Sequence, residues 1–123
     1  MTNSEERVER RKHKRFRAHE DAYVVLKPCT VGPLIDISMD GLTLEYVSIK
    51  QPSKMESELD IAMTNNAVSL RNVPCKILSD FEVEGVSSNP LSIRQCCVQF
   101  RDLTQHQISK LEYFIHNHTV GEV

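Results

Sequence analysis

The sequence of 123 residues has no tryptophan, only four glycines and an aromatic fraction of 6%. None of its apolar runs approaches the roughly 20 residues that a membrane-spanning helix needs. Residues 1–6 are polar and acidic, and they lack the apolar segment of a secretory signal peptide. These absences predict a cytoplasmic protein that does not insert into membranes.

The common motifs of enzymes and metal sites are missing as well. We find no H-E-x-x-H, no G-x-S-x-G and no Walker phosphate loop. The four cysteines, Cys29, Cys75, Cys96 and Cys97, show no C-x-x-C spacing. We therefore expect no catalysis, no cofactor and no metal, and we interpret the cysteines as reduced thiols. On a strand, Cys96 and Cys97 point to opposite faces, and we expect Cys96 in the core.

Charge is distributed unevenly along the chain, although the formal net charge is only −2. Residues 7–17 hold seven of the 15 lysines and arginines and a single acidic residue. A basic arm on an acidic body suits a small anionic ligand, because the body repels a long polyanion. The alternative interpretation is that the basic run is a solvated, charged terminus.

From residue 22 onward the sequence predicts short strands. The predicted strands cover residues 23–27, 34–37, 42–46, 59–63, 68–70, 75–78 and 92–100. In the third of these, Leu42, Leu44 and Tyr46 share one face, and Thr43 lies on the other. Pro74 cannot donate a ladder hydrogen bond, so residues 75–78 are expected to be an edge strand or to begin after a bulge. This spacing of strands predicts a sandwich or a barrel.

A helix is predicted at the C-terminal end of the sequence. Thr104 and Gln107 have the spacing of a capping box, in which each side chain bonds the backbone of the other residue. An apolar stripe follows at helical spacing: Ile108, Leu111, Phe114 and Ile115. We expect this stripe to pack the helix on the strands.

Two short motifs, roughly twenty residues apart, supply complementary groups for one anionic ligand. Arg11 and Arg15 offer planar forks that bind phosphate or the O6/N7 edge of guanine bidentately. Asp36 offers a carboxylate that can accept from the nitrogen donors of guanine, and Ser38 can donate its hydroxyl to phosphate. Gly41 is expected to turn the backbone with a positive φ and to let a ligand approach closely.

In this order and separation, Arg11-x-x-x-Arg15 and Asp36-x-Ser38-x-x-Gly41 resemble the signature of the PilZ domain, the bacterial receptor module for cyclic di-GMP. The resemblance implies a fold dominated by β-structure: a six-stranded antiparallel β-barrel with a flexible N-terminal arm and one C-terminal α-helix. It places the arm in residues 1–21, the barrel in 22–103 and the helix in 104–119, all in one domain.

The resemblance also implies roles for individual residues. Arg11 and Arg15, assisted by Arg10, would hold guanine edges and phosphates, while Asp36 and Ser38 complete the site on the barrel surface. The expected function is that of a stand-alone receptor whose arm closes on cyclic di-GMP and changes the surface shown to an unidentified downstream protein. One departure is Cys97, which stands where many members have glycine and could crowd the ligand.

Several alternatives remain open. The chain could be a PilZ-like adaptor that acts through protein partners without nucleotide, or it could bind nucleic acid through the basic arm. The sequence pI of about 6.2 and the lack of tryptophan argue against nucleic acid. The run from Asp36 to Gly41 also mimics the start of an EF-hand loop, but the twelfth position is Val47 rather than a bidentate glutamate.

Overall fold

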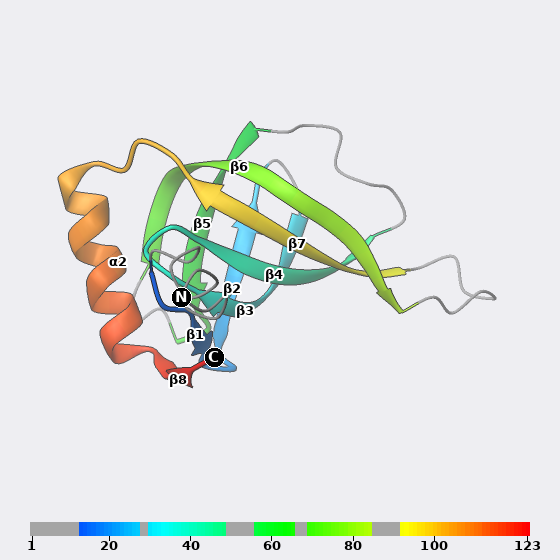
Figure 1. The fold of residues 1–123 in the computed structure, drawn as a ribbon, viewed down its shortest axis with the longest axis horizontal. Helices are drawn as coiled ribbons and strands as arrows, with labels where there is room; N and C mark the ends of the chain where they lie inside the picture. The colour runs from blue at the N-terminus through cyan, green and yellow to red at the C-terminus, as the bar shows by residue number, and fades with distance from the viewer. Residues whose placement is uncertain (1–12, 28–29, 49–55, 66–68, 85–91) are drawn as a thin grey trace, which may run out of the picture.

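The computed structural model describes residues 13–27, 30–48, 56–65, 69–84 and 92–123 (Figure 1). These residues form strands and, near the C-terminal end, one helix. In chain order the elements are β1 Phe16–Ala18, β2 Ala22–Leu26, β3 Thr30–Ile37, β4 Gly41–Ser48, β5 Glu56–Met63, β6 Ser69–Glu84, β7 Ser92–Phe100, α2 Gln105–Asn117 and β8 Thr119–Glu122.

Strands β2 to β7 form a closed, six-stranded antiparallel barrel. Their order is β2-β5-β6-β7-β4-β3, and pairing between β2 and β3 closes the ring. The first half of β3 pairs with β2, and its last residues pair with β1, which in turn pairs with β8. The predicted fold class, a six-stranded barrel with one C-terminal helix, is confirmed.

Two strands outside the barrel differ from the sequence-based division of the chain. Phe16–Ala18, which the sequence placed in the N-terminal arm, form β1 and lie in the sheet. The chain after the helix returns as β8 and pairs with β1. The end of the basic segment is therefore fixed next to β3, which carries Asp36.

Alternation along the strands separates an interior from an outer face. On β4, Leu42, Leu44 and Tyr46 are buried in the core, as their spacing predicted. Thr43 points to the other face but is only 4% exposed. A buried hydroxyl on the outer face needs hydrogen-bonding partners there.

Helix α2 lies beside the barrel, at the left of Figure 1. Leu111 and Phe114 are fully buried, and Ile115 packs against the core from a partly buried position. Thr104 Oγ1 accepts from the Gln107 amide at 3.0 Å, and Gln107 Oε1 accepts from the Thr104 amide at 3.0 Å. The predicted helix, its capping box and the packing of Leu111, Phe114 and Ile115 are confirmed, while Ile108 is half-buried.

The environment of Pro74 distinguishes between the two alternatives predicted for residues 75–78, an edge strand or a start after a bulge. Strand β6 runs through Pro74 and lies between β5 and β7, so residues 75–78 are not an edge strand. The register shifts between Leu59 and Ile61 of β5, opposite a stretch of β6 in which Asn72 has a φ of 56°. Pro74 keeps its register with Glu58, and its carbonyl accepts from the Arg101 amide at 2.8 Å, one residue beyond the end of β7. Because the nitrogen and the carbonyl of a strand residue point to the same side, the missing N–H faces the point where β7 has ended, and an interior strand can include the proline there.

Candidate functional site

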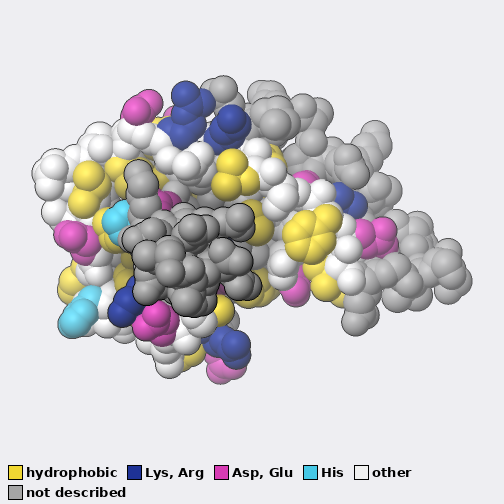
Figure 2. Space-filling model, viewed as in Figure 1, with side chains coloured by type: hydrophobic (Ala, Val, Ile, Leu, Met, Phe, Trp, Pro, Cys, Tyr) yellow, Lys and Arg dark blue, Asp and Glu magenta, His cyan; other side chains and the backbone are white. Residues whose placement is uncertain are grey.

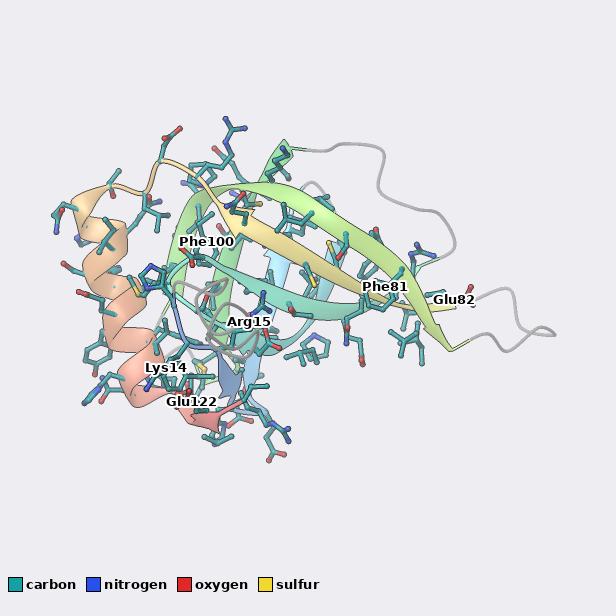
Figure 3. The ribbon with its side chains drawn as sticks, viewed as in Figure 1. Lys14, Arg15, Phe81, Glu82, Phe100 and Glu122 are labelled. Carbon is teal, nitrogen blue, oxygen red and sulfur yellow. The ribbon has the colours of Figure 1, made fainter. Side chains whose placement is uncertain are left out.

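The two charged motifs meet where β1 begins. Arg15 directly precedes β1, and Asp36 lies near the end of β3, which pairs with β1. Arg15 Nη1 donates to Asp36 Oδ1 at 3.1 Å, and the side chains are 32% and 17% exposed. The structure therefore joins one member of each motif across 21 residues of sequence; Figure 3 shows Arg15 over the sheet.

Asp36 also belongs to a row of side chains that crosses the outer face of the sheet. Arg17, Asp36, Thr43 and Cys97 are successive register partners on β1, β3, β4 and β7. Register partners place their side chains on the same face of a sheet. Four segments that lie far apart in the sequence thus contribute to one surface.

Thr43 contacts both Arg15 and Cys97. Its Oγ1 accepts from Arg15 Nη1 at 3.3 Å and lies 3.4 Å from Cys97 Sγ. These contacts are the partners that its buried hydroxyl needs. The sequence assigned Thr43 to the outer face but did not connect it with the arginine, because the pairing of β4 with β7 cannot be read from local patterns.

The turn after Asp36 has its own hydrogen bonds. The Ser38 amide donates to the Gly41 carbonyl at 2.8 Å, and Ser38 Oγ accepts from the Asp40 amide at 3.1 Å. The Asp40 carbonyl in turn accepts from the Phe100 amide of β7 at 2.8 Å. Ser38 is buried, at 4% exposed. Its hydroxyl oxygen supports the turn, while its hydrogen remains a donor.

The positive φ predicted for Gly41 is wrong, and the structure gives another reason for the glycine. It does not have a positive φ; it is the first residue of β4 and pairs with Gln99. A Cβ on Gly41 would lie 2.1 Å from the Val98 carbonyl oxygen, far inside van der Waals contact. The glycine lets the backbone of β7 pass close to the turn, so it sets the distance between β4 and β7 rather than the turn type.

The residues next to Arg15 are also held by acidic partners. His13 Nε2 lies 3.5 Å from Asp40 Oδ1, and Lys14 Nζ lies 3.8 Å from Glu122 Oε1 of β8. Figure 3 shows Lys14 and Glu122 close together. Lys14 and Glu122 form an exposed ion pair, which contributes little to stability, and the His13 contact is an ion pair only when the imidazole is protonated. Neither contact was predicted, and the one to Glu122 depends on β8, which was not predicted either.

The remaining predicted arginines, Arg10 and Arg11, lie outside the described residues. On the face shown in Figure 2, described side chains of both charge signs are interspersed over the sheet.

The described residues contain no group of three or more histidine, cysteine or acidic side chains that could hold a metal ion. Nor does this part of the chain contain a helix with the length and hydrophobicity to cross a bilayer.

The three cysteines that the structure describes divide by face. Cys96 points into the barrel and is fully buried, and burial raises the pKa of its thiol to about 12. Burial likewise raises the pKa of the Cys75 thiol to about 11. Cys97, on the outer face, is partly exposed and is the cysteine in contact with the site.

Chemically, this surface offers donors and acceptors side by side. The guanidinium of Arg15 has five N–H donors in one plane, and only Nη1 is engaged by Asp36 and Thr43. Asp36 uses Oδ1 for this contact, and no other described residue bonds its Oδ2. A ligand that presents both acceptors and N–H donors, as a guanine does, matches the pair.

Comparison with known proteins adds a family and a fold. A protein-family model described as PilZ domain matches residues 9–117, which include every described residue of the site. The PilZ domain with c-di-GMP of YcgR from Escherichia coli has a similar structure, with a TM-score of 0.68 at 15% identity over 89% of this chain and 91% of that chain.

A second similar structure is YcgR in complex with c-di-GMP, also from Escherichia coli. Its TM-score is 0.63 at 12% identity, over 87% of this chain and 45% of that chain. No curated protein matches the sequence. At these identities the two structures establish a shared fold.

Proposed function

This chain belongs to the PilZ domain family, and on that premise we propose that it is a receptor for cyclic di-GMP that binds the nucleotide without transforming it. The observation that carries the proposal is the contact between Arg15 and Asp36. It joins the two halves of the family signature on one surface. The c-di-GMP bound to the similar YcgR domain supports the same ligand.

Each site residue has a role that follows from its chemistry. Arg15 turns its free N–H groups toward phosphate or the O6/N7 edge of guanine. Asp36 accepts from the guanine nitrogens through Oδ2. Ser38 donates its hydroxyl hydrogen to a phosphate oxygen, and Gly41 keeps the turn close to β7 so that these groups share one surface.

In this proposal, Arg10 and Arg11 also contact the guanine edges and phosphates of the nucleotide. Both lie outside the described residues, and the support for them is their place in the R-x-x-x-R motif and in the family match. The arm that carries them closes over the nucleotide. Because the arm leads directly into β1, a change in the position of the arm also acts on Arg15, which directly precedes this strand.

The output of the receptor is a changed surface. Arm, nucleotide and barrel together form a surface that the ligand-free protein does not present, and an unidentified downstream protein in the cytoplasm reads it. In thermodynamic terms, the nucleotide shifts the population toward the closed arm by its differential affinity for that state.

Calorimetric titration with cyclic di-GMP tests the receptor function. The wild-type protein is compared with Arg15→Ala and with Arg71→Ala, a matched control in which an exposed arginine on β6 is removed. GTP and a short DNA duplex serve as ligand controls. We expect micromolar or tighter binding of cyclic di-GMP to the wild type and to Arg71→Ala, and loss of binding in Arg15→Ala.

Other results would redirect the proposal. If neither calorimetry nor a second binding method detects cyclic di-GMP, the receptor function is wrong and the nucleotide-free adaptor becomes the better hypothesis. Binding of the duplex alone would instead favour a nucleic-acid partner.

A further inference from the structure

Thr43 is the least accessible polar group in contact with Arg15. The residue is 4% exposed, whereas the side chains of Arg15 and Asp36 are 32% and 17% exposed. It lies directly between Asp36 of β3 and Cys97 of β7 in the sheet register. Thr43 is therefore fixed by two paired strands, and Arg15 is held by a rigid part of the barrel.

The Thr43 hydroxyl has two hydrogen-bonding partners among the described residues. It has one hydrogen and two acceptor lone pairs. One lone pair accepts from Arg15 Nη1, and the 3.4 Å contact with Cys97 Sγ occupies a second position, whichever of the two atoms donates. Cys97 thereby restricts rotation of the hydroxyl and keeps it directed at the arginine.

Two acceptors on a single guanidinium nitrogen constrain the whole group. Asp36 Oδ1 and Thr43 Oγ1 lie 3.1 and 3.3 Å from Nη1, and they come from neighbouring strands. Because the guanidinium is planar, holding Nη1 at two points also fixes the direction of the edge formed by Nε and Nη2. Among the described residues we find no acceptor for that edge, so none of them competes with a bidentate ligand for it.

We propose that Thr43, backed by Cys97, is a positioning residue that orients Arg15 so that its Nε/Nη2 edge faces the ligand. The orienting contact exists in the ligand-free protein, and its value for affinity rests on the proposed receptor function. Pre-orientation strengthens binding because the ligand does not have to immobilise a long, flexible side chain.

The first test does not involve the ligand. Side-chain ¹⁵N NMR of the ligand-free protein reports rotation and solvent exchange of the Arg15 guanidinium, with Arg15→Lys used to assign its signals. We compare the wild type with Thr43→Val, which keeps the shape but removes the hydroxyl, and with Thr43→Ser, which keeps the hydroxyl. Thr30→Val, at the opposite end of β3, is the matched control.

We expect slowed rotation and exchange in the wild type, Thr43→Ser and Thr30→Val, and faster averaging in Thr43→Val. In calorimetry, Thr43→Val should weaken cyclic di-GMP binding about three- to tenfold, with an unchanged thermal unfolding midpoint. Thr43→Ser and Cys97→Ser should stay within about twofold of the wild type, because each retains a hydrogen-bonding group.

The two assays separate the possible failures. Unchanged Arg15 dynamics in Thr43→Val would overturn the positioning role, whatever the protein binds. Faster dynamics with unaltered affinity would overturn it too, because orientation would then not matter for binding. Faster dynamics in a protein whose wild type binds no cyclic di-GMP would support the orienting contact and overturn the receptor function instead.

Discussion

Asp36 and Thr43 are cross-strand partners on β3 and β4, and both accept a hydrogen bond from the same nitrogen of Arg15. The last arginine of the basic motif is therefore bound to the barrel before any ligand arrives. A ligand does not have to break this arrangement, because the Nε/Nη2 edge and Asp36 Oδ2 are not used by it. A ligand can therefore bind beside the ion pair of Arg15 and Asp36 without replacing it.

Arg15→Lys tests whether geometry or charge matters at this position. Lysine keeps the positive charge but cannot bind one group through two parallel N–H donors while it also contacts Asp36. We expect Arg15→Lys to weaken cyclic di-GMP binding about ten- to hundredfold in calorimetry, nearly as much as Arg15→Ala. Affinity within about threefold of the wild type would show that the arginine acts only as a point charge.

Gly41→Ala tests the steric reason for the glycine. The new Cβ would lie 2.1 Å from the Val98 carbonyl oxygen, so β4 and β7 must move apart at the turn. We expect a lower thermal unfolding midpoint together with loss of nucleotide binding. Gln99→Ala is the matched control, since Gln99 is the exposed cross-strand partner of Gly41. An alanine variant as stable as the control would contradict the steric explanation.

Much of the barrel could be predicted because its signals are local. Alternation over residues 42–46 gave the inward face of β4, and the spacing of Thr104 and Gln107 gave the start of α2. Strands β1 and β8 carried no such signal. β1 lies within a continuous run of charges, and β8 has four residues directly after the helix. β1 is specified by pairing with β3 and β8, and β8 by pairing with β1.

The site was predictable only in part, for a similar reason. The two motifs indicated that Arg15 and Asp36 belong together, and the structure places them in contact, while their role toward a ligand stays a prediction. Thr43 and Cys97 lie 54 residues apart and meet through the register of β4 and β7. The positive φ expected for Gly41 was wrong because the turn motif indicates a glycine without indicating which constraint requires it.

Gln107→Ala tests how α2 is fixed to the barrel. Besides capping Thr104, Gln107 donates through Nε2 to the carbonyls of Arg71 and Asn72 at 3.2 and 3.3 Å, at the bulge of β6. We expect its loss to lower the free energy of unfolding in urea by about 1–2 kcal/mol. Gln105→Ala, at an exposed position in the first turn, should change it by no more than about 0.5 kcal/mol. Equal effects would show that the contacts to β6 contribute nothing.

The buried thiols predict how stability depends on alkaline pH. Burial raises the pKa of Cys75 to about 11 and that of Cys96 to about 12, from an ordinary value of 9.0. Above pH 9 the unfolded chain therefore loses thiol protons that the folded chain still holds. The stabilisation is complete below that pH and is lost as pH rises toward the folded values, by up to about 1.4 kcal/mol per pH unit for each thiol.

Urea unfolding between pH 7.5 and 10, under reducing conditions, measures this decline. Cys96→Ala should be less stable than the wild type at pH 7.5, because it leaves a small cavity, but its stability should fall less steeply above pH 9. Cys97→Ala, which removes the thiol on the outer face, should keep the wild-type slope of the two buried groups. If Cys96→Ala declined as steeply as the wild type, Cys96 would have to ionise as readily in the folded barrel as in the unfolded chain, which its complete burial opposes.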